Sequence, residues 1–437
     1  MKIQLFFLST FFSFNMYGLE VTHDMQKSAP RQAMALLIAV TANADNDLMQ
    51  VARILAKNLE RSGQFVVTVK GFAVPQKEND LTQLFDAQFP LEIFLNSSDE
   101  GKAIGWRLYD VPDKKLIKGK KYYKRGKLLH GYADNIADDL WPVLTSQPSS
   151  FSSKLAYVKK RDTLGKKKRD RSVVCIANSD GSQEQIIIPK LGTYVALYWH
   201  HDTHNPCLFC SEFTRFNVRL ISSNLQRQMR TVLNLKGTCV GISVAHDNNK
   251  SVYCRSGTIW QYAYDPVQKQ GVHKPLIHNE GKNVSPTLLD TGDIIFCSDS
   301  GTLRKGCSSL GPKIYRYAGR DGSITRITNE GYCVGPSYCK RTNKIAYSKK
   351  INGVMQLCIY DCSKNVDTQI TFDAGNKIDS CWSPCGTSIV YCYQKDRASR
   401  IAIIHARMKK VVFVTPATEY CSCPSWSPVY DSVPVIS

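Results

Sequence analysis

The feature that most constrains this chain is a phrase of sequence that returns at a nearly fixed interval. Near the C-terminus the chain reads Cys381-Trp382-Ser383-Pro384, and 44 residues after Trp382 it reads Trp426-Ser427-Pro428. A glycine stands seven residues before Trp382, and this spacing recurs upstream. At intervals of 45, 44, 50, 44 and 44 residues, the six anchor positions are Gly192, Gly237, Gly281, Gly331, Gly375 and Glu419. A period of roughly 40–45 residues that holds several short β-rich runs is typical of a β-propeller.

Each period contains four short runs with the composition of β-strands. Gly, Asn, Asp and Ser fill the segments between the runs, which are rich in Ile, Val, Tyr and Thr. In the copy that follows Gly331, the runs are 333–338, 344–347, 356–360 and 369–371. Such runs, separated by turn residues, predict strands. One period therefore predicts one four-stranded blade, and six anchors predict six blades.

The last copy has room for only one strand, so its other strands must come from another part of the chain. The phrase Lys154–Val158 resembles the second-strand phrase Lys344–Tyr347, and two further runs follow it at 173–177 and 185–188. We therefore expect three strands from the start of the propeller to complete the blade begun near Pro424. Ring closure protects strand edges that would otherwise be open to aggregation.

The beginning of the chain predicts export. Residues 3–14 are almost wholly apolar, Lys2 precedes them, and the small residue Gly18 follows. This pattern is typical of a signal peptide, which we expect to be cleaved after about residue 18. The apolar run is shorter than the roughly 20 residues that a membrane span needs. Residues 19–30 are polar and lack periodicity, which predicts a flexible segment.

Residues 31–145 predict an α/β domain. The apolar residues between Leu48 and Leu59 have helical spacing, those between Leu81 and Phe85 predict another helix, and the last helix covers 129–144. Strands are expected at 35–40, 65–69, 91–95, 104–109 and 116–123. The predicted fold class is an α/β N-terminal domain, with a mixed sheet and two or three helices, followed by an all-β six-bladed β-propeller. A linker at 146–153 leads to the propeller at 154–437.

The sequence offers little that could form a catalytic or metal site. Gly335–Cys339 departs from the Gly-x-Ser-x-Gly elbow of hydrolases at its last position. One cluster contains residue types that bind zinc, namely His200, His201, Asp202, His204, Cys207 and Cys210. Its histidines occupy the place of a turn, and cysteines three apart on a strand point to opposite faces. We expect no metal and no cofactor.

Cysteine is abundant, with 16 residues, all between Cys175 and Cys423. An oxidising compartment favours disulfides. Several cysteines, however, hold equivalent positions in different blades, where their Cα atoms would lie beyond the roughly 7 Å that a disulfide allows. We therefore expect that a minority are paired and that many are small buried hydrophobic residues.

The formal net charge is +20, and its densest basic run lies between Lys159 and Arg171. The centre of this run is Lys166, Lys167, Lys168 and Arg169. The blade scheme places it between a second and a third strand, on the face that carries the anchors. A positive rim there would attract an acidic protein, glycan or lipid surface, although a solvated flexible loop is the simpler explanation of the run and the one that we favour. An exported chain meets little nucleic acid, so we expect no nucleic-acid partner.

The chain resembles the TolB family, the periplasmic propeller proteins of the bacterial Tol–Pal envelope system. The resemblance covers nearly all of the expected mature chain and is strongest at the domain junction and the C-terminus. The phrases that carry it follow the leader in the order Leu19–Thr22, Leu59–Phe65, Trp106–Val111, His130–Thr145, Phe151–Val158 and Pro424–Pro428.

The resemblance implies a non-enzymatic, monomeric adaptor that is peripheral to the membranes. Family members bind the peptidoglycan-associated lipoprotein (Pal) through a face of the propeller, and their N-terminal segment engages the inner-membrane protein TolA. They support outer-membrane constriction during division and envelope integrity. Carried over by position, the TolA-type segment begins with Leu19, Glu20, Val21, Thr22, His23 and Asp24. Two alternatives stay open, an exported propeller that binds envelope glycan or lipid and an enzyme with a site in the central channel.

Overall fold

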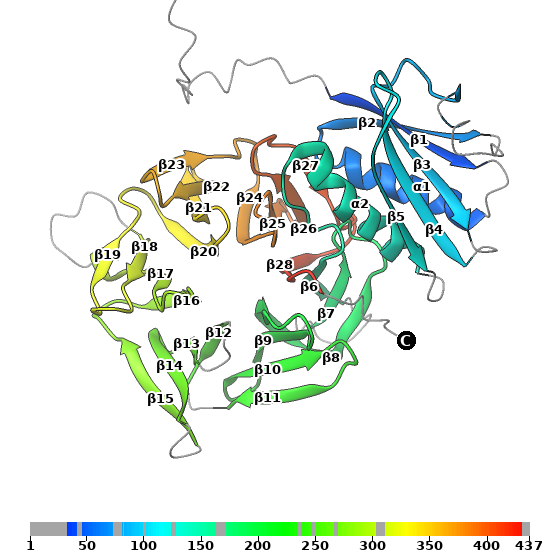
Figure 1. Cartoon of the computed structure of the whole chain (residues 1–437). Coiled ribbons are helices and arrows are strands. Elements are labelled where there is room, and N and C mark those ends of the chain that lie inside the picture. The colour runs from blue at the N-terminus through cyan, green and yellow to red at the C-terminus, as the bar shows by residue number, and fades with distance from the viewer. Residues whose placement is uncertain are drawn as a thin grey trace, which may run out of the picture.

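The computed structural model shows an N-terminal sheet with two helices beside a ring of small sheets (Figure 1). It describes residues 33–41, 46–72, 81, 83–98, 102–123, 128–161, 171–234, 237–245, 250–265, 270–302 and 311–430. The predicted signal peptide, the segment 19–30 and the basic residues 166–169 lie outside these ranges. Within the ranges, no helix has both the length and the apolar character needed to cross a membrane.

The N-terminal sheet is mixed, as predicted, with the strand order β2-β1-β3-β4-β5. Its first three strands in this order are parallel to one another, and β4 is antiparallel to both β3 and β5. The elements are β1 (Met34–Thr41), α1 (Asn46–Glu60), β2 (Phe65–Phe72), β3 (Leu91–Ser98), β4 (Ala103–Asp110), β5 (Lys115–Tyr123) and α2 (Leu129–Thr145).

Both helices pack on one face of this sheet because each carries an apolar stripe. On α1 the stripe includes Leu48, Leu55 and Leu59, all fully buried, and these residues share a core with Trp106 of β4 and Ile136 of α2. Full burial of one such side chain contributes about 1.5–3 kcal/mol. The repeated three- and four-residue spacing of the stripe therefore fixes which side of each helix faces the sheet.

Where a further helix was predicted between Leu81 and Phe85, the described residues form only a short 3₁₀ turn. In this turn the Leu84 amide donates to the Leu81 carbonyl at 3.0 Å. The side chain of Asp86 then accepts the Gln88 amide at 3.1 Å, and this hydrogen bond stabilises a turn in place of a helix. Leu81 and Phe85 pack instead against Phe94 on the second face of the sheet. The apolar residues that suggested a helix serve as a cover for this face.

The remaining strands form six blades, which confirms the predicted propeller. Two of the blades are joined in one seven-stranded sheet, because β8 is the outer strand of one blade and the inner strand of the next. From the inner strand outwards, the first of these blades comprises β28 (Cys421–Trp426), β6 (Lys154–Lys160), β7 (Ser172–Asn178) and the start of β8 (Gln185–Trp199). The second comprises the end of β8, β9 (Cys207–Phe213), β10 (Val218–Asn224) and β11 (Met229–Leu233).

The other four blades are regular antiparallel sheets of four strands. They are, in chain order, β12 (Cys239–Val244), β13 (Lys250–Arg255), β14 (Thr258–Asp265) and β15 (Gln270–Ile277); β16 (Asn283–Leu288), β17 (Ile294–Ser298), β18 (Lys313–Tyr317) and β19 (Ile324–Arg326); β20 (Cys333–Cys339), β21 (Lys344–Ile351), β22 (Val354–Asp361) and β23 (Val366–Gln369); and β24 (Asn376–Trp382), β25 (Ser388–Lys395), β26 (Ala398–His405) and β27 (Val411–Phe413). A short 3₁₀ helix covers Ser300–Thr302.

The second strands supply the large buried side chains of the ring. Among the largest fully buried side chains are aromatic residues from five blades, Tyr157, Tyr253, Phe296, Tyr347 and Tyr391. Apolar clusters join neighbouring blades, and one of them unites Ala346 and Leu357 of one blade with Ile389 and Ala402 of the next. In the blade that contains both ends of the propeller, β28 pairs antiparallel with β6, so that Trp426 lies opposite Leu155. The domain boundaries at residues 31, 146 and 154 stay a prediction.

Candidate functional site

All six inner strands contain a β-bulge at the same place in the repeat. The residue four positions after each anchor has a left-handed backbone conformation, with φ between 50° and 73°. These residues are Ala196, Gly241, Ser285, Gly335, Asp379 and Cys423. In every blade the register of the inner strand against its neighbour shifts at or next to this residue. A bulge bends a strand and redirects its side chains, so the ring repeats one bend six times around its axis.

The bend leaves two consecutive residues of each inner strand accessible at the centre of the ring, around which the inner strands are arranged (Figure 1). The first residue of each pair is apolar in five blades, and the set is Val195, Val240, Val284, Val334, Ile378 and Ser422. We call these six residues the apolar ring. The second residue of each pair is the bulge residue. Small apolar groups that are exposed together form a surface suited to another protein's apolar side chain.

Asp379 is the one acidic residue among these twelve. Burial raises the pKa of its carboxyl, whereas hydrogen bonds from Cys423 in the next blade act in the opposite direction. The residue is nonetheless accessible to solvent, because the centre of the ring is open to water although protein surrounds it. Because the Asp379 carboxyl accepts hydrogen bonds from the neighbouring blade, it helps to hold the two blades together.

Hydrogen bonds link the bulge regions of neighbouring blades at five of the six contacts between blades. The residue two positions after the bulge carries a hydroxyl or thiol group. At four of the contacts between neighbouring blades, this group accepts a hydrogen bond from an inner-strand amide of the following blade. The pairs are Val244 N to Tyr198 Oη at 3.2 Å, Leu288 N to Ser243 Oγ at 2.9 Å, Trp382 N to Ser337 Oγ at 3.2 Å and Trp426 N to Cys381 Sγ at 3.4 Å. In a fifth junction Thr287 Oγ1 donates to the Pro336 carbonyl. These contacts fix the blades relative to one another and hold the apolar ring in shape.

Five of the anchors lie just before the inner strands, and Gly192 lies within β8, between its outer-strand and inner-strand parts. A side chain at Gly237 would meet Ser256 Oγ at 2.5 Å, and one at Gly375 would meet the Gln394 carbonyl oxygen at 2.9 Å. Both glycines have positive φ, at 96° and 86°. Glycine therefore recurs because the chain must turn tightly against the hairpin between the second and third strands. We call this side of the propeller, with its anchors and these hairpins, the anchor face.

Glu419 replaces the glycine in the last copy and makes an ion pair there. Its Oε1 lies 2.7 Å from Lys159 Nζ, which also lies 2.8 Å from Glu184 Oε1. The neighbouring Lys160 amide donates to the Tyr420 carbonyl at 2.9 Å. These contacts place the start of the predicted basic segment on the anchor face, although residues 166–169 themselves lie outside the described ranges.

The α/β domain packs against the opposite face, which carries the turns between first and second strands and between third and fourth strands. Ser150 Oγ donates to Cys385 Sγ at 3.0 Å, and Lys410 Nζ donates to the Glu60 carbonyl at 2.7 Å. The segment between the two domains is itself held in place, because Asp138 of α2 accepts the Phe151 and Ser152 amides at 2.7 and 2.9 Å. Sequence reasoning missed these contacts, since they join residues up to 350 positions apart.

The comparisons with known proteins agree with this architecture. Residues 141–430 match the model of the TolB β-propeller domain, a match that covers more than half of the chain. The chain belongs to the TolB β-propeller family. The Tol-Pal system protein TolB of Rickettsia prowazekii (strain Madrid E) is 25% identical over 255 residues, 56% of this chain and 56% of the relative. The chain thus matches about half the length of this curated relative.

Two solved structures extend the likeness at the level of the fold. TolB from Acinetobacter baumannii superposes with a TM-score of 0.74 at 21% identity, over 92% of this chain and 98% of that chain. Kuenenia stuttgartiensis hydrazine synthase superposes with a TM-score of 0.51 at 10% identity, over 64% of this chain and 47% of that chain. At these identities the likeness shows the fold alone. The TolB match nevertheless spans both the α/β part and the propeller.

In this TolB-family propeller, the candidate zinc ligands from His200 to His204 lie in the loop between β8 and β9, and Cys207 and Cys210 lie on β9. Asp202 accepts the His204 and Asn205 amides at 2.9 and 3.2 Å, and His201 Nε2 lies 2.8 Å from Tyr198 Oη. Cys210 is buried and Cys207 is half-buried. Across the described residues, no group of three or more His, Cys, Asp or Glu is placed to hold a metal ion.

Fifteen of the sixteen cysteines lie in the described residues, and no disulfide joins any two of these fifteen. The expectation that a minority are paired is therefore wrong for pairs among these fifteen. Most of them are buried, in agreement with the expectation that they act as small hydrophobic residues. Burial also raises the pKa of several of these thiols, for example that of Cys392 to about 11, which disfavours the reactive thiolate.

Proposed function

We propose that the chain is a non-enzymatic adaptor of the Tol–Pal system that works in the periplasm after cleavage of a signal peptide at about residue 18. Its propeller would bind a peptidoglycan-associated lipoprotein, and its N-terminal segment from Leu19 to Asp24 would engage a TolA-type inner-membrane protein. This linkage would support outer-membrane constriction and envelope integrity. The observation that carries the proposal is membership of the TolB β-propeller family, in a chain whose likeness to a solved TolB spans both domains.

The geometry favours the anchor face as the surface for the lipoprotein. The α/β domain occupies the opposite face, so the two sides of the propeller are chemically and sterically distinct. The apolar ring offers accessible Val and Ile side chains around the centre of the propeller, and Val284 is 39% exposed. Interfaces draw most of their binding energy from a few apolar anchors near the centre, with a polar rim around them. The charged side chains of Lys159 and Glu419 are suited to such a rim.

A binding assay with purified proteins tests this proposal. The mature chain, from Leu19 onwards, would be titrated with the soluble domain of the peptidoglycan-associated lipoprotein from the same organism. We expect saturable binding that Val334→Lys weakens at least tenfold, because a lysine would place a charge in the apolar centre of the interface. The matched control is Val66→Lys on β2, where the wild-type side chain is 56% exposed and belongs to the α/β domain.

Either of two results would contradict the proposal. Absence of binding by a folded wild-type chain would remove the assigned function and favour a glycan or lipid ligand. Equal weakening by Val334→Lys and Val66→Lys would retain the partner but exclude the anchor face as its binding surface.

A further inference from the structure

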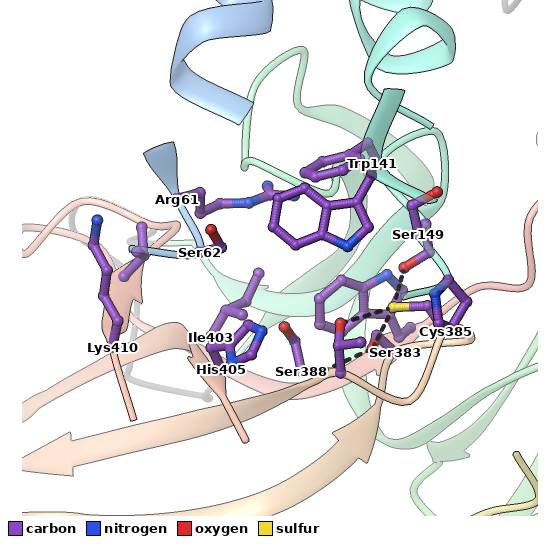
Figure 2. Close-up of a pocket in the computed structure, with 16 residues that line it drawn as sticks. Arg61, Ser62, Trp141, Ser149, Ser383, Cys385, Ser388, Ile403, His405 and Lys410 are labelled. Carbon is purple, nitrogen blue, oxygen red and sulfur yellow. Dashed lines mark hydrogen bonds between the residues drawn. The ribbon is translucent and has the colours of Figure 1, made fainter. Parts of the chain in front are cut away.

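A cavity of about 50 Å³ lies at the junction between the α/β domain and the propeller (Figure 2). From the α/β side, Arg61, Trp141 and the segment 148–151 line it. From the propeller side, the turn at 383–388 and the residues around His405 and Lys410 line it. A buried water needs roughly 10–15 Å³ by this kind of measure. The space therefore suits about four waters, or one ion with three to five heavy atoms.

The residues that line the cavity include cations but no carboxylate. Its sixteen residues include two cations, Arg61 and Lys410, together with His405. None of the sixteen is an aspartate or a glutamate. The lining also includes six hydroxyl residues and one thiol, namely Ser62, Ser149, Ser150, Ser383, Thr387, Ser388 and Cys385. Charge complementarity therefore favours an anion in this space.

Arg61 is the more unusual of the two cations. Its Nη2 donates to Ser179 Oγ at 3.1 Å, and its guanidinium lies over the Phe151 ring, 5.4 Å from the centroid. Its Nη1 is buried and has no hydrogen-bond partner among the described residues. A buried guanidinium without a carboxylate partner costs several kcal/mol. Burial accordingly lowers the pKa of Arg61, although the charges of Asp180, Asp134 and Asp138 act in the opposite direction.

His405 offers a second unpaired donor in the same cavity. The side chain is 6% exposed, and its Nδ1 accepts the Met408 amide at 3.1 Å. The proton of the neutral ring must therefore be on Nε2, which is buried and has no partner among the described residues. Burial, with a smaller contribution from Arg407, lowers the pKa of His405 to about 4. At neutral pH, Nε2–H is thus a fixed donor in the cavity lining.

We propose that this cavity binds a small oxyanion, of the class of inorganic phosphate or a carboxylate ion, between Arg61 and His405 at the domain junction. The oxyanion would satisfy Arg61 Nη1 and His405 Nε2, the two buried donors that lack partners. Charge-assisted hydrogen bonds of this kind are about twice as strong as neutral ones. Because Arg61 belongs to the α/β domain and His405 to the propeller, the bound ion would also fasten the two domains together. The proposal concerns the junction and does not depend on the partner of the anchor face.

Thermal unfolding of the mature chain tests the site. Sodium phosphate and sodium acetate would be titrated separately into a chloride buffer of constant ionic strength. We expect at least one of them to raise Tm saturably, by about 2 °C or more at ten times the dissociation constant. Arg61→Gln should abolish this rise. The matched control is Arg397→Gln on the exposed β25–β26 hairpin, and this variant should retain the rise in Tm.

A second variant guards against a folding defect in Arg61→Gln. His405→Phe preserves the volume of the ring but removes Nε2–H, so we expect the affinity for the active anion to fall at least tenfold. A response to phosphate alone would identify a tetrahedral oxyanion, and a response to acetate alone would identify a carboxylate, and both would support the site. The proposal is overturned if neither anion gives a saturable shift, or if the affinity is the same in the wild type and in both folded variants.

Discussion

Asp134 of α2 should make the stability of this chain depend on pH. Its side chain is 3% exposed, and its Oδ1 accepts Asn58 Nδ2 of α1 at 2.7 Å. Burial raises the pKa of the carboxyl from 3.8 to about 7, against the opposing effect of the Asn58 hydrogen bond. Asn58 Oδ1 is buried without a partner. A protonated Asp134 could therefore pair with the Asn58 amide through both of its oxygens, whereas a carboxylate could not.

The sign and size of the effect follow from proton binding. Between pH 3.8 and about 7, the folded chain retains a proton that the unfolded chain has lost. The free energy of unfolding then falls by about 1.4 kcal/mol for each pH unit. Over this window the loss is on the order of 4 kcal/mol, complete once the pH exceeds the folded pKa. Asparagine reproduces the shape and the donor of the protonated acid but cannot ionise, so Asp134→Asn should avoid this loss.

Urea denaturation of the wild type and Asp134→Asn from pH 4 to pH 8 measures the difference. We expect the stability of Asp134→Asn relative to the wild type to increase steadily with pH and to level off above pH 7. Asp139→Asn, on a half-exposed side of the same helix, is the matched control for loss of a carboxylate from α2. A difference between Asp134→Asn and the wild type that stays constant from pH 4 to pH 8 would refute the reasoning.

Three further predictions concern the propeller and its junction with the α/β domain. Ser337→Ala removes the acceptor of the Trp382 amide, so the free energy of unfolding in urea should fall by about 1–3 kcal/mol, whereas Ser363→Ala in an exposed turn should change it by less than about 0.5 kcal/mol. Gly375→Ala should cost more than Gly353→Ala in the same assay, because both have positive φ but only a side chain at Gly375 meets backbone, and equal costs would contradict this account. Trp426 Nε1 donates to Ser153 Oγ at 2.7 Å, so Ser153→Ala should leave this buried donor without a partner and lower Tm. An unchanged melting curve would contradict this prediction.

The sequence predicts the propeller well because one physical requirement recurs in every blade. A tight turn against the second-strand hairpin needs glycine, so Gly237, Gly331 and Gly375 mark the starts of inner strands. The aromatic residue of the second strand, such as Tyr347, recurs for a similar reason, since each blade needs a large side chain in its core. The repeat period thus results from local conformation and packing, and both can be predicted from a single sequence.

The bulges and the domain junction leave weaker signals. Four of the six bulge residues are not glycine, so their left-handed conformation has no common residue type that would reveal it. Arg61 and His405 lie 344 positions apart in the sequence, and nothing local shows that they line one cavity. The helix predicted at Leu81 is only a short 3₁₀ turn, because apolar residues that cover a sheet face can have helical spacing without forming an α-helix.

Hydrogen exchange of the mature chain, with and without the soluble domain of the peptidoglycan-associated lipoprotein, tests the central claim most directly. We expect bound partner to slow exchange in peptides that contain the apolar ring and the anchors, above all 237–241, 331–335 and 375–379. Peptides from α1 and from the exposed strand β5 should exchange at unchanged rates. Protection confined to the α/β domain, or no protection at saturating partner, would contradict the assignment of the anchor face as the binding surface.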